Sequence, residues 1–379
     1  MSRRIPASPA LLSIFLAGCN TYDSTSMYGT SFRQVNLVSD TTLYEARIRD
    51  ANLANPWGIA AGPDGTIWVA DNRTGRASLY DGEGNSQGNP VTIPGAAADS
   101  AGMPGLPGSL PVTSVGDVTS VGDVTSAGAP TGVAYNGTAG FPMPDGTGKA
   151  VFLFAGEDGT VSGWNGGMTA KIVVDRSDSG SVYKGLALAS DAGADFLYLA
   201  DFRNRHVDVY DAQFHRDTTR RFADSTLPAD YGPFNVALVG NELFVTYARL
   251  KGPDNEDDSA GVGSGYVNVF GTDGAFKRRF LSNGRLNSPW AVLSIPGTYG
   301  PFDDGIYVGN FGDGVINVFD AQGRFLGQVQ DGSGHPVLLQ GLWGLYLSGD
   351  GDYGDISRLY FTAGPAKEAH GLFGYLVPE

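Results

Sequence analysis

Four oxygen-bearing side chains occupy the same place in a repeated sequence pattern, directly after a short apolar run. They are Asp71, Glu157, Asp201 and Asn310. Carboxylate and amide oxygens are the ligands that Ca²⁺ prefers, and the ion takes roughly 6–8 of them at about 2.3–2.6 Å. Asp and Asn after a strand also cap turns by bonding to the backbone nearby. The pattern therefore predicts a calcium site or a set of turn caps, and calcium is the one cofactor that the residues suggest.

A second set of residues flanks the apolar runs and could contact a ligand. It comprises Asn55, Trp57, Lys184, Asn235, Tyr247, Trp290 and Trp343. The tryptophans share one position of the repeat, which suits packing between repeats because large aromatic rings bury much surface. A ring of tryptophans at a channel opening would instead suit a sugar or another flat ligand. Lys184 is the only cation at its position, so it pairs with a neighbouring carboxylate or meets an anionic group of a substrate.

Histidine is scarce, and His370 is the one candidate general acid or base near the expected ligand site. Its ordinary pKa suits proton transfer near neutrality. Glu368 lies two residues earlier, and side chains two apart on a strand share a face, so the two could form a dyad. The alternative is a histidine that only makes hydrogen bonds. The acidic run Asp254–Asp258 lacks the glycine and final glutamate of an EF-hand loop, and we expect a solvated loop there.

These residues belong to six copies of one unit, which begins in the first copy as Asn55-Pro56-Trp57-Gly58. The copies start at residues 55, 129, 183, 232, 287 and 341. In the fifth copy, four short strands can be read at 290–294, 305–309, 315–320 and 324–329. Periods of roughly 50 residues that contain several short strands are typical of propeller blades. The repeats therefore predict one propeller domain.

The last copy, 341–379, is too short for four strands. Residues 32–40 resemble the fourth strands of other copies, so we expect this N-terminal strand to complete the last blade and remove an open sheet edge. The sequence thus predicts an all-β, six-bladed propeller over 32–379, with a low-complexity loop insertion at about 96–128. The loops that enter first strands and those that follow second strands share one face of such a fold. We expect the candidate site residues at the channel mouth on that face.

The charge and the first residues of the chain limit its partners. The 379 residues carry a formal net charge of −15, and no basic stripe is present, which excludes a nucleic-acid partner. Arg3 and Arg4, a short apolar run and Leu16-Ala17-Gly18-Cys19 predict a signal peptide over 1–18. The last four residues resemble the bacterial lipobox, which implies lipid attachment at Cys19 and a tether over 19–31. We expect an exported outer-membrane lipoprotein that is monomeric and contacts the membrane only through its lipid.

Several motifs resemble those of a known family. The pattern Asn55-Pro56-Trp57-Gly58, with residues 156–165, 286–290 and 370–374, is similar to an uncharacterised family of exported bacterial propeller proteins. The similarity runs from about Val35 to the C-terminus and departs at 96–128, 259–263 and 367–369. More distantly the units resemble NHL repeats, which implies six blades. The family has no established activity to transfer.

Three functions stay open at this stage. The first is a ligand- or partner-binding protein of the cell envelope. The second is a calcium-dependent hydrolase, lactonase or lyase with its site at the channel mouth and His370 as acid or base. The third is a scaffold that binds nothing at the mouth.

Overall fold

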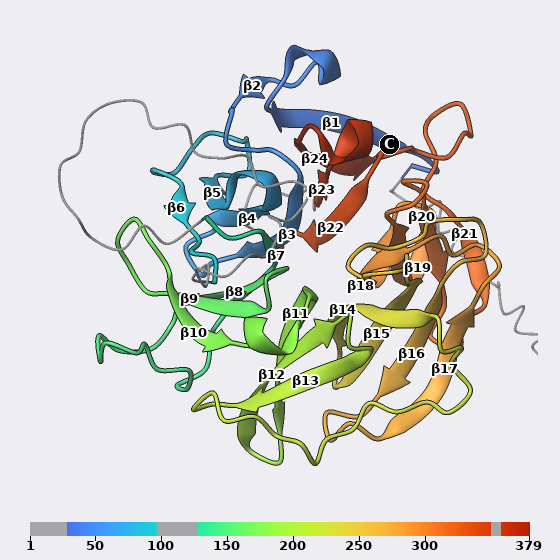
Figure 1. Cartoon of the computed structure of the whole chain (residues 1–379). Coiled ribbons are helices and arrows are strands. Elements are labelled where there is room, and N and C mark those ends of the chain that lie inside the picture. Colours follow the sequence, from blue (N-terminus) through green and yellow to red (C-terminus); the bar gives the residue numbers. More distant parts are fainter. Residues whose placement is uncertain (1–28, 97–126, 350–357) are drawn as a thin grey trace, which may run out of the picture.

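The computed structural model describes residues 29–96, 127–349 and 358–379, which form six β-sheets arranged around a central axis (Figure 1). The six-bladed, all-β architecture expected from the repeats is thereby confirmed. The predicted signal peptide and the tandem repeat at 112–126 lie outside the described residues, as does most of the tether. No helix in the described ranges is long and apolar enough to cross a membrane.

Each blade contains the strands of one repeat in chain order. Blade one is β3 (Pro56–Ala61), β4 (Ile67–Asp71), β5 (Arg76–Tyr80) and β6 (Val91–Thr92); blade two is β7 (Pro130–Tyr135), β8 (Phe152–Gly156), β9 (Thr160–Trp164) and β10 (Lys171–Asp175). Blade three is β11 (Tyr183–Asp191), β12 (Ala194–Asp201) and β13 (His206–Asp211); blade four is β14 (Tyr231–Val239), β15 (Glu242–Arg249), β16 (Tyr266–Phe270) and β17 (Phe276–Ser282). Blade five is β18 (Pro289–Tyr299), β19 (Phe302–Asn310), β20 (Ile316–Phe319) and β21 (Phe325–Gln328). Blade six contains β22 (Leu342–Leu347), β23 (Leu359–Ala363) and β24 (Leu372–Pro378).

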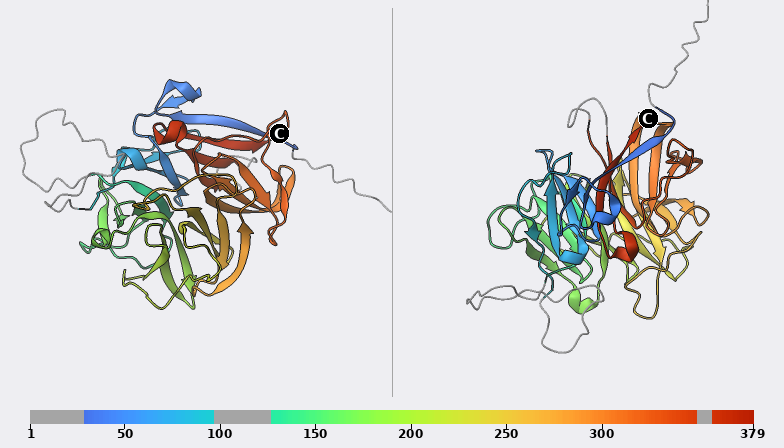
Figure 2. Two further views of the ribbon diagram at one scale, coloured as in Figure 1. Left: turned by 45° about the vertical axis from the view of Figure 1, so that its right-hand side comes forward. Right: turned by 90° about the horizontal axis from the view of Figure 1, so that it is seen from above.

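The ring is closed by the N-terminal strand, as the sequence predicted. β1 (Phe32–Ser39) pairs antiparallel with β24, so that Phe32 lies opposite Pro378 and Ser39 opposite Leu372. Figure 2 shows β1 beside the C-terminal strand. β2 (Ile48–Arg49) adds a short parallel pairing at the outer edge. Because the chain ends thus complete one sheet, blade six has no long unpaired edge.

The inner strands approach one another closely around the axis. A Cβ atom on Gly58 would lie 2.6 Å from the backbone nitrogen of Val133, and one on Gly185 would lie 2.0 Å from Oδ1 of Asn235. In all six inner strands the pairing register also shifts near the first residues, as a β-bulge does. Bulges re-aim side chains at the rims of β-structures. The same local feature in six blades therefore directs the first residues of the inner strands toward one end of the channel.

Blade three departs from the four-stranded plan. In the part of the chain that the structure describes, its sheet has only three strands, and residues 212–230 connect β13 to β14 without forming a strand. That connection contains Asp, Thr, Arg and Pro in place of the alternating apolar residues of an outer strand. Two backbone hydrogen bonds, from Asp217 to Val209 and from Asp211 to His215, tie it to the edge of β13.

Candidate functional site at the channel mouth

An aromatic cluster, here called the tryptophan plug, fills the channel. It consists of Trp57, Trp290, Trp343, Phe202 and Phe234, all at most 5% exposed. The rings of Trp57 and Trp343 are stacked with centroids 3.5 Å apart, and Trp290 meets both edge-on. Because the ring faces contact one another, the tryptophans pack between blades and do not form an open platform for a sugar. Of the two roles predicted for these tryptophans, the structure shows packing between blades and not the ring of ligand contacts.

Polar partners hold the plug in place. Nε1 of Trp343 donates to Oδ1 of Asn55 at 3.0 Å, and Nε1 of Trp290 donates to the carbonyl oxygen of Lys184 at 3.0 Å. Nδ2 of Asn235 donates to the carbonyl oxygen of Trp290, also at 3.0 Å. Nε1 of Trp57 is buried and makes no hydrogen bond with any described residue.

A charged cluster, here called the mouth cluster, lies against the plug. It consists of Lys184, Glu157, Asp258, Glu368 and Asn55. The side chain of Lys184 is only 3% exposed and donates to Oε1 of Glu157, while its Nζ lies 5.2 Å from the ring centre of Trp57. Lys184 therefore pairs with a carboxylate of the neighbouring blade, which is the first of the two roles that its sequence position suggests.

Glu368 enters the cluster from blade six. Its Oε2 accepts a hydrogen bond from Nδ2 of Asn55 at 2.8 Å, and Asn72 donates in the same way to Glu157 at 2.8 Å. Asn55 and Asn72 contact each other at 3.3 Å. A continuous polar network therefore joins blades one, two, three and six at the mouth.

Asp258 reaches the cluster from the loop between β15 and β16. Its side chain accepts a hydrogen bond from Oγ of Ser288, at the start of blade five. The acidic run 254–258 was expected to be solvated, and Asp254 is indeed exposed, but Asp258 is only partly so. The sequence singles out the acidic run, but the position of Asp258 depends on how the insertion 251–265 folds.

The backbone is strained where the cluster forms. Asn55, Ser288 and Glu368 have φ values of 49°, 47° and 66°, in the left-handed region. Ala366 and Lys367, within the short turn α1 (Pro365–Glu368), have φ values of 56° and 57°. Each such non-glycine residue costs roughly 1–2 kcal/mol, and such residues gather at functional sites. The strain places Glu368 and Asn55 toward each other.

Burial and neighbouring charges shift the pKa values of the mouth cluster. Burial, reinforced by repulsion from Glu157, raises the pKa of Glu368 to about 7, although the hydrogen bond from Asn55 opposes the shift. Burial also raises the pKa of Asp258. For Lys184, burial disfavours the charged form, but attraction to Glu157 outweighs it and raises the pKa. Near neutral pH the cluster therefore holds one ammonium group and a carboxyl group that can gain or lose a proton.

The four residues proposed for calcium are not brought together. Asp71 is buried in blade one and accepts a hydrogen bond from Ser78 at 2.6 Å, while Asn310 donates to the carbonyl oxygen of Arg285 at 2.8 Å. Asp201 accepts from the backbone nitrogens of Val182 and Asn204, which is the turn-capping alternative. Glu157 alone belongs to the mouth cluster. The predicted common site is wrong in its geometry, because each blade directs its own residue into its own turn or sheet.

Within the described ranges, one group of acidic and histidine side chains has the spacing of a metal site: Asp201, His206 and Asp208. Asp208 accepts hydrogen bonds from Arg216 and, at 2.8 Å, from the hydroxyl group of Tyr183. Nε2 of His206 lies 3.1 Å from Oδ1 of Asp208. The guanidinium group of Arg216 already neutralises Asp208, so a side chain of the protein provides the positive charge that a metal ion would bring.

Two further predicted residues lie outside the mouth cluster. Nδ1 of His370 contacts Oδ2 of Asp40 at 3.0 Å and its ring packs near Tyr44, so the Glu368–His370 dyad does not form. The left-handed turn at Glu368 breaks the extended geometry on which that dyad depended. Tyr247 also does not face the mouth, since it lines a cavity between blades three and four.

Comparisons with known proteins agree with this fold. The sequence profile of the NHL repeat matches residues 53–76. The uncharacterized protein R648 of Acanthamoeba polyphaga mimivirus is 34% identical over 361 residues, covering 92% of this chain and 81% of that protein. The uncharacterized protein L690 of the same virus is 33% identical over 355 residues, covering 90% and 85%.

Among solved structures, a protein of unknown function from Bacteroides thetaiotaomicron is similar with a TM-score of 0.52 and 12% identity. The similarity covers 91% of this chain and 76% of that one. At this identity it shows the fold alone. The identities to the two viral proteins extend over most of each sequence. This chain therefore belongs to the family of the uncharacterized proteins R648 and L690, and in it that family's sequence folds as a six-bladed β-propeller.

Proposed function

We propose that this protein is an exported, lipid-anchored binding protein of a bacterial cell envelope, and that the mouth cluster reversibly binds a small ligand with a positively charged amine. One observation carries the ligand proposal. Glu157, Asp258 and Glu368 converge from separate blades around a single buried lysine. Burying charges is costly, so such a cluster is retained where it serves a function.

The chemistry of the mouth cluster favours a cation over an anion. Its carboxyl groups outnumber its one ammonium group, and the pKa of Glu368 is raised to about 7. A bound amine favours the ionised form of Glu368, because opposite charges stabilise each other. Binding is therefore coupled to proton release from Glu368.

Titration calorimetry tests this proposal with amines and their neutral counterparts. The probes are ethanolamine and glucosamine, compared with ethylene glycol and glucose. At pH 7 we expect the amines to bind with proton release, measured as a dependence of the heat on the buffer's ionisation enthalpy. Glu368→Gln should weaken amine binding by about tenfold and abolish proton release. Equal binding of amines and neutral probes, or unchanged proton release in Glu368→Gln, would contradict the proposal.

Anchoring rests on the sequence around Cys19 and has its own test. Expressed in a Gram-negative host, the full chain should incorporate an alkyne-labelled fatty acid and sediment with the envelope. Cys19→Ser should remove the label and release the propeller into the soluble fraction. A labelled Cys19→Ser variant, or an unlabelled parent protein, would overturn the anchoring proposal without affecting the ligand proposal.

A second candidate function follows from the pKa of Glu368. A carboxyl group that titrates near pH 7 beside a buried lysine is suited to general acid–base catalysis. The protein would then be a hydrolase or lyase, with Glu368 in the role that the sequence had offered to His370. Turnover of an ester or lactone that is lost in Glu368→Gln and retained in His370→Asn would favour this alternative.

A further inference from the structure

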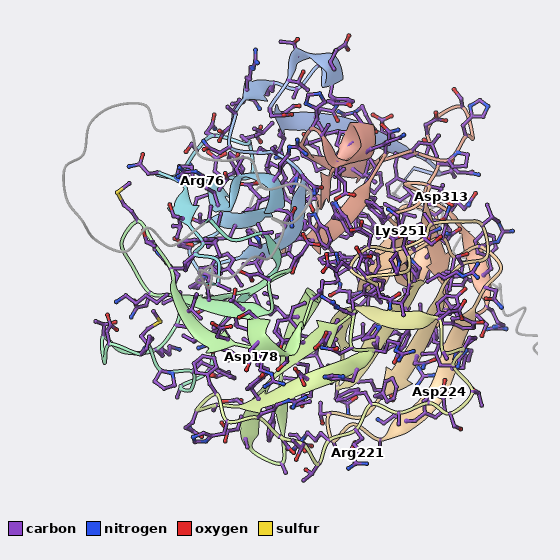
Figure 3. The ribbon with its side chains drawn as sticks, in the orientation of Figure 1. Arg76, Asp178, Arg221, Asp224, Lys251 and Asp313 are labelled. Carbon is purple, nitrogen blue, oxygen red and sulfur yellow. The ribbon has the colours of Figure 1, made fainter. Side chains whose placement is uncertain are left out.

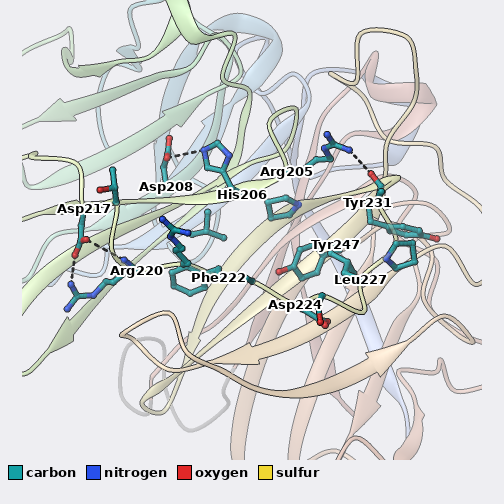
Figure 4. A pocket seen from close by; sticks show the side chains of 18 of the residues that line it. Arg205, His206, Asp208, Asp217, Arg220, Phe222, Asp224, Leu227, Tyr231 and Tyr247 are labelled. Atoms are coloured by element: carbon teal, nitrogen blue, oxygen red, sulfur yellow. Dashed lines mark hydrogen bonds and ion pairs between the residues drawn. The ribbon is translucent and has the colours of Figure 1, made fainter.

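A cavity of about 590 Å³ lies between blades three and four, and none of the plug residues lines it. Here called the outer cavity, it is lined by the start of β13, by residues 216–229 of the connection and by β14 and β15. Figure 4 shows Asp208 and His206 on one side of it and Tyr247 and Leu227 on another. The cavity exists because blade three has no outer strand at this position. Its volume is in the range of small-molecule sites.

The polar part of the outer cavity has an excess of positive charge in a chain whose net charge is −15. Four arginines line it: Arg205, Arg216, Arg220 and Arg221. Arg216 pairs with Asp208, and Arg220 pairs with Asp217 and with Asp191. The remaining lining carboxylate, Asp224, is neutralised by Arg279 from behind the cavity.

Two of the four arginines therefore have no carboxylate partner. Arg205 donates only to the carbonyl oxygen of Ala229, at 2.8 Å. The side chain of Arg221 makes no hydrogen bond or ion pair with any described residue. Figure 3 shows Arg221 at the outer rim of the ring. Guanidinium groups bind carboxylate groups through paired hydrogen bonds, so Arg221, which has no other partner, can hold an anion.

The rest of the lining is apolar and aromatic. Phe222 packs against Tyr198 and Phe270, with ring centres 5.7 and 5.1 Å apart, and so forms a fixed wall. Leu227 and Tyr247 also line the cavity, and Tyr247 is only 4% exposed. An apolar wall beside unpaired guanidinium groups fits a ligand that is flat at one end and anionic at the other.

We propose that the outer cavity binds an aromatic carboxylate, with its ring against Phe222, Leu227 and Tyr247 and its carboxylate group on Arg221. This site is independent of the mouth cluster. The two sites select opposite charges, since the mouth cluster is acidic and the outer cavity is basic. The connection 212–230 thus forms a ligand pocket where other blades have their fourth strand.

Calorimetric titration of the propeller with 2-naphthoate, 2-naphthamide and inorganic phosphate tests this inference. The naphthamide has the same ring without the charge, and phosphate has the charge without the ring. We expect 2-naphthoate to bind at least about tenfold more tightly than either control. Arg221→Gln should remove the preference for naphthoate over naphthamide. The matched control Arg324→Gln, an arginine 79% exposed on blade five, should leave binding unchanged.

Three results would each overturn the proposal. They are the absence of naphthoate binding at millimolar concentration, equal affinity for naphthoate and either control compound, and an equal loss in Arg324→Gln and Arg221→Gln. Circular dichroism of each variant shows that the fold is kept. Failure here leaves the amine-binding proposal unaffected, because the two titrations use different probes and different variants.

Discussion

The mouth cluster and the outer cavity both contain several charged side chains, but these are mostly buried in the mouth cluster, whereas the arginines of the outer cavity are partly exposed. At the mouth, Lys184 is almost fully buried and depends on Glu157 for its charge. In the outer cavity, Arg221 is exposed and has no carboxylate partner. The mouth gathers residues from several blades, whereas the outer cavity is built by one connection and the two blades that it joins.

This difference indicates at which of the two sites the removal of a charged group should destabilise the propeller. Removing one partner of a buried ion pair strongly destabilises the folded protein, because the other charge stays buried without a partner. An exposed charge is hydrated in both the folded and the unfolded chain, so its removal changes little. The mouth cluster should therefore control stability as well as binding, and the outer cavity should control binding alone.

The largest expected effect is that of Lys184→Met. Removing the ammonium group leaves Glu157 without its ion pair and increases the repulsion among the mouth carboxylates. We expect a loss of about 3–5 kcal/mol in the free energy of unfolding at pH 8, measured by urea denaturation. Arg221→Gln, in the outer cavity, is the matched comparison and should change the free energy by no more than about 0.5 kcal/mol.

Equal and small changes in the two variants would show that the mouth charges are solvated, and the comparison would fail. A large change in Arg221→Gln would instead show that this arginine holds the connection 212–230 in place.

A smaller and pH-dependent effect is expected for Glu368→Gln. Because burial raises the pKa of Glu368 from 4.5 to about 7, the folded chain binds a proton over this interval that the unfolded chain releases. The stability from that proton is present below about pH 4.5 and is lost as the pH rises through about 7. Relative to Glu368→Gln, the parent should therefore lose up to about 3 kcal/mol between those limits.

Glu242→Gln is a control with the opposite sign. Burial opposes the shift, but Arg278 and Lys277 lower the pKa of Glu242, so its contribution is present at neutral pH and is lost on acidification. Urea denaturation should give slopes of opposite sign relative to the parent, between about pH 4.5 and 7 for Glu368→Gln and below pH 4.5 for Glu242→Gln. Parallel slopes would contradict the raised pKa of Glu368.

Much of the fold could be predicted because it rests on local patterns that recur. The six copies of the unit predicted the blades, and the likeness of residues 32–40 to other fourth strands predicted the closing strand β1. The four strands read in the fifth copy correspond to β18, β19, β20 and β21. The missing strand of blade three was not predicted, since the length of 212–230 alone does not show whether it forms a strand.

The candidate site was predicted less completely. Asn55, Lys184 and Glu157 meet at the mouth because the repeat places each of them at the start of a first strand or directly after a second strand. Asp258 was expected in a solvated loop, but a long insertion carries it to the mouth. Tyr247 was misplaced because neighbouring residues of a strand point to opposite faces, and it faces the outer cavity.

The amino-acid sequence is sufficient to predict the repeat, the six blades, the closure of the ring and the positions from which a mouth residue can come. These depend on apolar periodicity and turn residues, which act within a few residues of one another. Which charged groups meet depends on the folded ring. Examples are the hydrogen bond between Asn55 and Glu368 and the ion pair between Lys184 and Glu157. Left-handed backbone at Asn55 and Glu368 and the packing of the tryptophan plug fix those contacts. The protonation of Glu368 follows from burial, which exists only once the ring has closed.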